Sequence, residues 1–304
     1  MVGASGRTGA ALCRALLASG RPFRPVVRDL ARWRAQGLPV AARPADLTDH
    51  AALVRALEGA STIVCCAHAR HARALIAAAP PSARFVLLGS TRRFSRWPDE
   101  HGEGVRFGEE SLLASGRRGV MLHPSMIYGA QGEDNVRRLA ALLKRLPVAP
   151  LPDGGRALVQ PIHQDDLTRC ILAAIDQDWS GPEVLVVAGP EAVPYRHFLA
   201  AVARASGLRP PPILSVPGVL LRWMAPLSRL LPGLPLIREA ELRRLSEDKA
   251  FDVGPMRERL GVVGATLEDG LARSFVAPLA PGRDPTQTDA VQAEPHHAHH
   301  QPHR

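Results

Sequence analysis

Three glycines spaced three residues apart, Gly3, Gly6 and Gly9, constrain the fold of this chain more than any other feature of its sequence. They lead into a helix-forming run of alanine and leucine that ends at Gly20. Glycine permits a tight turn and a close backbone approach, while the first N–H groups and the positive dipole end of the following helix attract an anion. The stretch therefore predicts a phosphate-binding turn that opens the first helix, with a glycine-rich surface loop as the alternative.

Apolar runs of strand length alternate with helix-forming segments after this turn. Strands are expected at residues 23–29, 40–43, 61–67 and 84–90, with helices at 51–57 and 75–79 between them. This alternation predicts an α/β fold, a Rossmann-like doubly wound parallel sheet, in which ligands bind at the carboxyl ends of the strands. Gly3, Arg28, Asp46, Ala67 and Ser90 all fall at those ends. We therefore expect one ligand site along that edge of the sheet.

The expected second strand ends in Arg28 and Asp29. In a doubly wound sheet this strand tip meets the adenosine ribose of a dinucleotide. A carboxylate there binds the 2′-hydroxyl, whereas an arginine suits a 2′-phosphate. Arg28 therefore favours NADP as the cofactor, and Asp29 leaves NAD as the alternative.

The chain carries a formal net charge of +9 at pH 7 and is 46% hydrophobic, so it can bury a substantial core. Basic proteins often bind nucleic acid, but here the arginines are scattered along the chain and aromatic residues make up 4%. Few rings are thus available to stack on bases. We expect no nucleic-acid partner, and the sequence leaves the oligomeric state open.

The four cysteines, Cys13, Cys65, Cys66 and Cys170, lack the spacing of metal ligands, and we expect no metal site. Cys65 and Cys66 are neighbours in an expected strand, so their side chains should point to opposite faces of the sheet. Buried, reduced thiols are typical of a cytoplasmic protein, which is the compartment we expect.

No apolar stretch has the length that a transmembrane helix needs. The nearest candidate, Val216–Ile237, is interrupted by arginines and prolines. It predicts a pair of packed helices rather than a peripheral contact with a membrane surface. Four apolar residues in this segment recur at helical spacing, and we interpret them as packing residues: Leu220, Trp223, Met224 and Leu227.

Several segments together resemble one known family. They are Gly3–Gly9, Val26–Asp29, Ala45–Leu47, Glu109–Gly116, His123–Gly129, Gln160–Leu167 and Arg244–Lys249. The chain resembles the extended or atypical short-chain dehydrogenases/reductases, a group related to nucleotide-sugar epimerases/dehydratases, NmrA-like proteins and the complex I accessory subunit of that fold. The similarity spans about residues 1–275. Its most specific parts are the glycine turn and the Pro-x-x-Ile-Tyr-Gly segment, where His123 replaces the family's arginine.

The resemblance implies a domain organisation and a set of cofactor contacts. We expect an NAD(P)-binding domain over residues 1–190, in which 130–160 contribute to the cap, and a small, mainly helical C-terminal substrate domain over 191–280. Residues 281–304 are polar and rich in histidine, and we expect a disordered tail. The residues expected to bind the cofactor are Gly3, Ser5, Gly6, Arg7, Thr8, Gly9, Arg28, Asp46, Leu47, Ala67 and Pro124.

The chain departs from the family at the catalytic pair, a tyrosine with a lysine four residues later. The only tyrosines are Tyr128 and Tyr195, and neither is followed by a lysine at that spacing. Counted back from Glu110, the positions of the pair hold Gly102 and Arg106. An arginine can keep the ribose contact of the lysine but cannot act as a general base at neutral pH.

The expected catalytic residues are therefore Ser90, His101 and Arg106. Ser90 is placed to bind a substrate oxygen, and His101 to replace the tyrosine, with an ordinary loop histidine as the alternative. A second departure is the short first strand, since only Met1 and Val2 precede the glycine turn and a central strand needs about five residues. We expect the natural start to lie upstream, with a shortened first strand as the alternative.

Two functions fit these patterns. The first is an NADP-dependent oxidoreductase or nucleotide-sugar epimerase-like protein, which moves a hydride between the nicotinamide and a small-molecule substrate. The second is a protein that binds NADPH without catalysis and has no substrate, either a redox sensor or a respiratory-complex assembly or accessory subunit. The missing tyrosine and lysine favour the second, whereas the family's usual activity favours the first.

Overall fold

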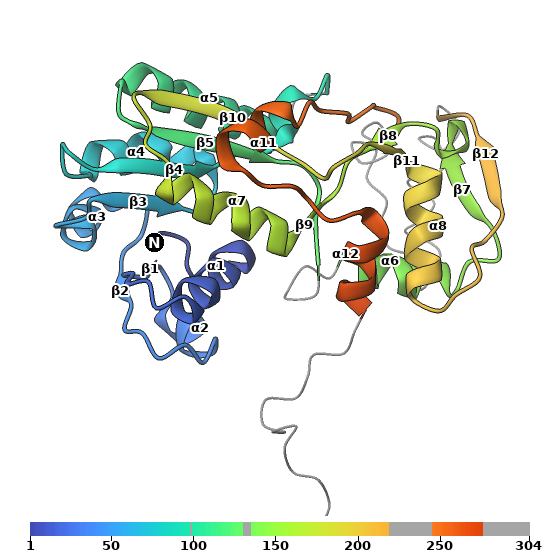
Figure 1. The fold of residues 1–304 in the computed structure, drawn as a ribbon, viewed down its shortest axis with the longest axis horizontal. Coiled ribbons are helices and arrows are strands. Elements are labelled where there is room, and N and C mark those ends of the chain that lie inside the picture. The colour runs from blue at the N-terminus through green and yellow to red at the C-terminus, as the bar shows by residue number, and fades with distance from the viewer. Residues whose placement is uncertain (98, 130–134, 219–244, 276–304) are drawn as a thin grey trace, which may run out of the picture.

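The computed structural model describes residues 1–97, 99–129, 135–218 and 245–275. Figure 1 shows two lobes. The larger is a parallel sheet with helices on both faces, and the smaller combines helices with short strand pairs. The predicted α/β fold is confirmed, and the sheet of the larger lobe positions the candidate site.

Four strands of the described chain pair in parallel in the spatial order β10, β5, β4, β3. They are β3 (Thr62–Cys65), β4 (Arg84–Leu88), β5 (Gly119–Pro124) and β10 (Pro182–Val187). β3, β4 and β5 are rich in apolar residues and buried along most of their length, as expected for strands covered by helices on both faces, whereas in β10, at the edge, only Leu185 and Val187 are buried. Their carboxyl ends therefore meet at one edge of the sheet.

Val2 continues this sheet beyond β3. It forms parallel bridges to Cys65 on one side and to Val26 on the other. Val26 belongs to β1 (Val26–Val27), which pairs in parallel with β2 (Arg43–Pro44). A single residue thus fills the first-strand position in this chain, and the spatial order is β2, β1, Val2, β3, β4, β5, β10. The glycine turn lies in the middle of the carboxyl edge.

Helices cover both faces of the sheet. One face carries α1 (Arg7–Ala18), α7 (Gln164–Asp176) and α11 (Gly254–Leu260). The other carries α3 (His50–Leu57), α4 (Ala72–Ala78) and α5 (Glu100–Ser115), while α2 (Leu30–Arg34) lies between β1 and β2 in the chain. Adjacent strand residues pack into different cores, since Val86 contacts the first set and Leu87 the second. Cys65 and Cys66 also separate in this way, as predicted.

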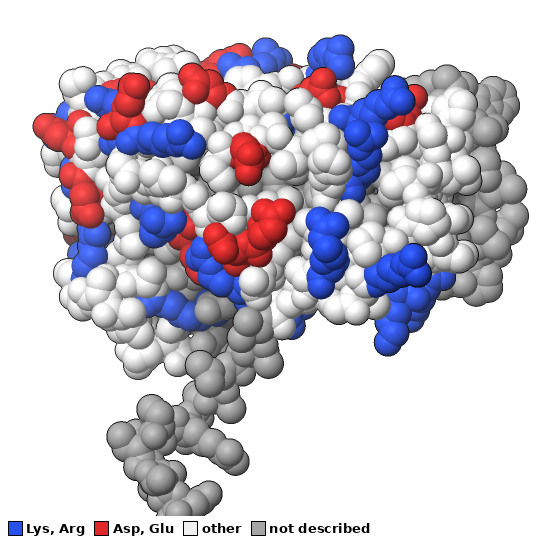
Figure 2. Space-filling model, turned by 45° about the vertical axis from the view of Figure 1, so that its right-hand side comes forward, with Lys and Arg blue, Asp and Glu red and all other residues white. Residues whose placement is uncertain are grey.

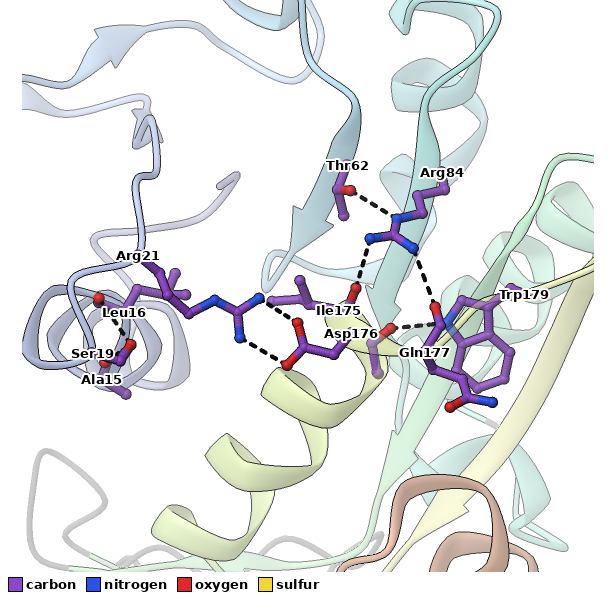
Figure 3. Close-up of polar contacts among 11 residues, drawn as sticks. Ala15, Leu16, Ser19, Arg21, Thr62, Arg84, Ile175, Asp176, Gln177 and Trp179 are labelled. Carbon is purple, nitrogen blue, oxygen red and sulfur yellow. Dashed lines mark hydrogen bonds and ion pairs between the residues drawn. The ribbon is translucent and has the colours of Figure 1, made fainter.

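The end of α7 opposite the candidate site is anchored by side chains from neighbouring elements (Figure 3). Arg84 Nη2 donates to the Ile175 carbonyl at 2.9 Å, and Trp179 Nε1 donates to another carbonyl in the last turn, also at 2.9 Å. Arg21, which follows α1, forms a bidentate ion pair with Asp176 at 2.6 and 2.9 Å. These donors satisfy helix carbonyls that lack intrahelical partners and complement the negative end of the helix dipole.

The smaller lobe has its own hydrophobic core, which includes Tyr128, Phe198 and Leu271. Its helices are α6 (Asn135–Leu143), α8 (Tyr195–Ala205) and α12 (Leu267–Phe275). Its strands pair in twos: β6 (Ile127–Tyr128) with β9 (Ile162–His163), β7 (Ala149–Pro152) with β12 (Ile213–Val216), and β8 (Leu158–Val159) with β11 (Val193–Pro194). After β8 the chain returns to the larger lobe through β9 and α7.

Part of the predicted, mainly helical domain over residues 191–280 is not helical. Ile213–Val216 forms β12, paired in parallel with β7. Three prolines at positions 210–212 remove the N–H donors that a helix needs, and branched residues follow them. α11 packs on the core of the larger lobe, so the boundary at residue 190 stays a prediction.

Two other predictions lie outside the described residues: the helical pattern at Leu220, Trp223, Met224 and Leu227, and the histidine-rich tail at 281–304. None of the helices that the structure describes is long and apolar enough to cross a membrane. Basic and acidic side chains are interspersed over the face of the larger lobe shown in Figure 2.

Candidate functional site

A cavity of about 430 Å³ lies at the carboxyl ends of β1, β2 and β3, beside the glycine turn. Six of the residues predicted to bind a cofactor line it: Gly3, Ser5, Arg28, Asp46, Leu47 and Ala67. These residues come from segments up to 64 positions apart, and the parallel sheet brings them together at one edge. The cavity also includes Arg32, His68 and His71, which the sequence did not single out as ligands.

The glycine turn has the backbone geometry that phosphate binding requires. Gly3 has φ +73°, and a Cβ placed there would lie 2.8 Å from the Ala67 amide nitrogen. A Cβ at Gly9 would collide with the Gly3 carbonyl. Gly6 is the N-cap of α1 and supplies no side-chain hydrogen bond to the first turn. The turn thus fits a pyrophosphate, because the helix amides face the cavity edge without a side-chain cap.

The other predicted cofactor residues do not line this cavity. Arg7 begins α1 and is exposed. Thr8 Oγ1 donates to Gln164 Oε1 at 3.4 Å and so joins α1 to α7. Pro124 ends β5, and its carbonyl accepts from the Thr91 hydroxyl at 3.3 Å. Their cofactor contacts stay predictions.

Two arginines and one aspartate form the outer wall of the cavity. Arg28 follows β1, and Arg32 lies in the first turn of α2. Asp29 is the N-cap of α2, because its Oδ1 accepts from the Arg32 N–H at 3.0 Å. The cap explains why Arg32 lines the same cavity as Arg28, and an Asp at this helix start is the sequence signal that would have placed it.

Asp46 lies at the end of β2 and is held in one orientation. Its Oδ1 accepts from both the N–H and the hydroxyl of Thr48, at 2.8 and 2.7 Å. These hydrogen bonds lower the pKa of Asp46, so the carboxylate is ionised at neutral pH. Thr48 thus orients Asp46 and does not cap α3. The N-cap of α3 is Asp49, whose Oδ1 accepts from the Ala52 N–H at 2.9 Å.

His68 and His101 form a pair at the inner end of the cavity. His68 follows β3 and precedes the 3-10 helix η1 (Ala69–His71), while His101 is in the first turn of α5. His68 Nε2 lies 3.1 Å from His101 Nδ1, and the rings meet edge to face with centroids 4.4 Å apart. Burial and the neighbouring His101 lower the pKa of His68 to about 4. The sequence predicted His101 as the replacement for the catalytic tyrosine, but it did not predict that His101 pairs with His68.

Ser90, the predicted substrate-binding serine, is held from below by a buried network. Its N–H donates to His123 Nδ1 at 3.1 Å, and His123 Nε2 lies 2.8 Å from Glu109 Oε2. Arg93 Nη2 donates to Glu109 Oε1 at 2.6 Å. Burial would raise the pKa of Glu109, but the hydrogen bonds from His123 and Arg93 outweigh it and lower this pKa to about 2.

This network fixes two further properties of the site. Because His123 Nδ1 accepts from an amide, its proton lies on Nε2, facing the carboxylate. The Ser90 hydroxyl accepts from the Arg92 N–H at 3.2 Å and caps the 3-10 helix η2 (Thr91–Phe94). A Cβ at Gly89 would collide with the His123 ring, so the glycine makes room for this histidine.

Arg106, the third predicted catalytic residue, lies on the exposed side of α5. It pairs with Glu103 at 2.6 Å and with Glu110 at 3.3 Å. Its contact with a cofactor ribose stays a prediction. The two neighbouring glutamates differ sharply, since the side chain of Glu109 is 6% exposed and that of Glu110 is 60% exposed.

Within the described parts of the chain, no group of three or more His, Cys, Asp or Glu side chains is arranged to hold a metal ion. All four cysteines are free thiols. Burial raises the pKa of Cys13 and Cys170 to about 12 and that of Cys65 to about 11. These thiols are therefore protonated at neutral pH and are poor nucleophiles.

Residues 3–116 match the family model for NAD(P)H-binding domains. This confirms the predicted nicotinamide dinucleotide domain over the segment that builds the cavity. Among curated proteins, the uncharacterized protein Rv2047c of Mycobacterium tuberculosis is 27% identical over 269 residues, which cover 86% of this chain. The chain spans about a quarter of that relative's length, since the match covers 27% of it. Mb2073c of Mycobacterium bovis gives the same figures.

Solved structures share the fold along nearly the whole chain. The NADPH-dependent quinone oxidoreductase QOR2 of Escherichia coli, complexed with NADPH, has a TM-score of 0.71 at 19% identity, covering 90% of this chain and 98% of its own. The nucleoside-diphosphate-sugar epimerase PA4631 of Pseudomonas aeruginosa gives 0.67 at 20%, covering 90% and 94%. MoeE5 in complex with UDP-glucose and NAD gives 0.66 at 20%, covering 90% and 95%. At these identities the likeness concerns the fold.

Proposed function

We propose that this chain, which has the NAD(P)H-binding domain and the fold of extended short-chain dehydrogenases/reductases, binds NADP and takes part in hydride transfer to or from a small-molecule substrate. The observation that carries this proposal is the cavity at the carboxyl edge of the sheet, which gathers Gly3, Arg28, Asp46 and Ala67. Each of them follows a different strand position, and together they match the parts of a dinucleotide.

The residues that line the cavity indicate which part of the cofactor each would hold. The glycine turn and the amides that begin α1 would hold the pyrophosphate. Asp46 and Leu47, after β2, would hold the adenosine half. The nicotinamide half would be held on the other side of the turn, by residues that follow β3 and β4, where Ser90 is fixed by its hydrogen bond to His123.

The charges of the outer wall favour NADP over NAD. Arg28 and Arg32 supply two guanidinium groups, which suit a 2′-phosphate. Asp29, the group that would bind a free 2′-hydroxyl, uses its carboxylate to cap α2. The two arginines of the outer wall thus suit the added negative charge of a 2′-phosphate.

Bound NADPH would supply a hydride from C4 of the nicotinamide, and water or a group other than tyrosine would supply the proton to the substrate oxygen. The chain's own residues orient the substrate: Ser90 offers a hydroxyl near the reacting oxygen, and the ionised Glu109 holds the segment that carries Ser90 through His123. The substrate is a small carbonyl compound or a nucleotide sugar. Folds of this type serve both, as the names of QOR2 and PA4631 indicate.

The alternative is NADPH binding without turnover, in a redox sensor or an accessory subunit of a respiratory complex. The absence of the usual tyrosine and lysine supports it. A thiol-based sensor is not supported, since the cysteines are protonated and largely buried. A cytoplasmic location stays part of either proposal.

The test is a fluorescence titration of the purified chain with NADPH and NADH, followed by turnover against a panel of quinones, aldehydes and nucleotide sugars. We expect tight binding of NADPH, at least about ten-fold weaker binding of NADH, and turnover of at least one carbonyl class. Tight binding without any turnover would support the alternative. A chain that binds neither nucleotide would contradict both.

A further inference from the structure

The register of α5 decides which residues occupy the places of the missing tyrosine and lysine. Counted back from the exposed Glu110, these places hold Gly102 and Arg106. Glu109, however, is the glutamate that the fold holds in place, because it is buried and contacts His123 on β5. Counted back from Glu109 by the same eight and four residues, the places hold His101 and Val105.

Side-chain contacts on α5 agree with the second register. Val105 is 1% exposed and packs in the core, so it has no polar role. His101 points toward the sheet edge, where it meets His68 at the end of β3. Arg106 points away and is held by two glutamates of its own helix. The residue on α5 that reaches the cofactor side of the sheet is therefore His101.

The proton positions in the histidine pair follow from one backbone amide. The Arg70 N–H donates to His68 Nδ1 at 3.1 Å, so this nitrogen carries a lone pair. In the neutral ring the proton of His68 is then on Nε2, which faces His101 Nδ1 at 3.1 Å. His101 Nδ1 accepts the hydrogen bond from this N–H and therefore carries a lone pair. The proton of His101 is therefore on its Nε2.

The position of the pair indicates which part of a cofactor it meets. His68 lines the cavity beside Ala67, on the far side of the glycine turn from Arg28 and Asp46. A Cβ placed at Gly102, next to His101, would lie 3.0 Å from the Arg92 carbonyl in η2, the segment that follows β4. His101 thus lies over the ends of β3 and β4, which is where the proposed function puts the nicotinamide half.

We propose that His101, positioned by His68, donates an Nε2–H hydrogen bond to a hydroxyl of the ribose on the nicotinamide side of the cofactor. In the resembled family the lysine of the catalytic pair supplies this ribose contact. Here His68, at the end of β3, and His101, on α5, would supply it together. The inference rests on the proposed function. His101 has a further interaction in the structure, and the ribose hydroxyl would exchange with it.

The surroundings of His68 keep it neutral. Arg70 and His71 face His68 from its own side, and Glu100 and His101 face it from α5. Burial and the positive neighbours lower the pKa of His68, so the His68 ring is uncharged at neutral pH. A proton added to His101 Nδ1 would oppose the Nε2–H of His68. His68 therefore positions His101 by fixing its tautomer as well as its orientation.

The first experiment compares His101→Ala with Arg106→Ala by isothermal titration with NADPH and with 2′,5′-ADP, which lacks the nicotinamide half. We expect His101→Ala to weaken NADPH binding about five-fold, the value of one neutral hydrogen bond, and to leave 2′,5′-ADP binding unchanged. Arg106→Ala should change neither. Unchanged 2′,5′-ADP affinity also shows that the variant is folded.

The opposite result, in which Arg106→Ala weakens NADPH selectively and His101→Ala does not, would overturn the assignment and restore the first register. Equal loss for both ligands with His101→Ala would also overturn it, because the effect would then not belong to the nicotinamide half. If the unchanged chain binds neither ligand, the proposed function itself fails. The two failures are thus distinct.

The second experiment tests the positioning role of His68 through pH dependence. The affinity of each variant for NADPH is divided by that of the unchanged chain at the same pH, so that titration of His71 and of the 2′-phosphate cancels. In His68→Ala, the Nε2–H of His68 no longer opposes a second proton on His101, which can then bind below about pH 6.5, the ordinary pKa of a histidine. The affinity ratio should therefore rise about three-fold from pH 7.5 to 5.5. His68→Gln, which keeps a donor toward His101, should give a constant ratio. A constant ratio in both variants would contradict the positioning role.

Discussion

The two halves of the candidate site use different kinds of chemistry. The half over β1, β2 and the glycine turn relies on backbone shape, such as the positive φ of Gly3, and on a few charged side chains at strand tips. The half over β3, β4 and α5 relies on contacts between side chains from separate elements, such as the pair of His68 and His101. The first half keeps the pattern of the resembled family, and the second departs from it.

This difference shows where a fold of this type tolerates change. A pyrophosphate is the same in every dinucleotide, and a close backbone approach admits only glycine at positions such as Gly3 and Gly9. The contacts of the nicotinamide half depend on pairs, and a pair can be replaced if both partners change together. Gly89 and His123 form such a pair in this structure, because a Cβ at Gly89 would collide with the histidine ring.

The sharpest way to break the comparison is a valine at Gly3. Its Cβ would overlap the backbone of Ala67, and a β-branched residue is strained at φ +73°. We expect Gly3→Val to lower NADPH affinity by at least about a thousand-fold, or about 4 kcal/mol. The measurement is fluorescence titration, with Gly20→Ala as the control, since Gly20 also has positive φ but faces open space. Wild-type affinity in Gly3→Val would refute the pyrophosphate assignment.

The nicotinamide half is tested through Glu109. Its folded pKa of about 2 lies below the ordinary value of 4.5, so its stabilising contribution is present above pH 4.5 and is lost as the pH falls toward 2. Glu109→Gln should lower the free energy of unfolding by about 3 kcal/mol at pH 7, and by much less at pH 2. Urea unfolding at both pH values measures this. A pH-independent difference between the two proteins would show that Glu109 does not titrate as inferred.

Specificity in the adenosine half depends on Arg28. We expect Arg28→Glu to weaken NADPH binding about thirty-fold, or about 2 kcal/mol, because a charge that attracts the 2′-phosphate becomes one that repels it. NADH affinity should change by less than about three-fold. Arg138→Glu, an exposed arginine on α6, is the control with the same change in net charge. Equal losses for NADPH and NADH would mean that Arg28 does not read the 2′-phosphate.

The smallest effect concerns Asp29, which caps α2 in the structure and whose type of side chain could instead bind a ribose hydroxyl. Asp29→Asn keeps a good N-cap and should leave stability unchanged, whereas Asp29→Ala should lower the free energy of unfolding by about 1 kcal/mol. Neither change should alter NADPH affinity by more than about two-fold. A selective loss of NADH affinity in Asp29→Asn would instead assign the carboxylate to the ribose. Thermal unfolding and titration together distinguish these outcomes.

Sequence patterns alone predicted the parts of the site that depend on local order. The alternation of strand and helix, the glycine spacing and the residues after each strand led to Gly3, Arg28, Asp46 and Ala67, and all four line the cavity. Parallel strands bring their carboxyl ends to one edge whatever the details of packing, so a residue that directly follows a strand is placed without knowledge of the tertiary structure.

Tertiary structure alone decided the contacts between elements. His68 and His101 are 33 residues apart and meet because α5 has one rotation on the sheet rather than another. That same rotation buries Glu109 and exposes Glu110, although the sequence offers both equally. One residue along a helix turns the side chain by about 100°, so the identity of a residue on α5 became informative only once its packing face was known. The sequence determined which strand ends form the site, and the phase of one helix determined which side chains enter it.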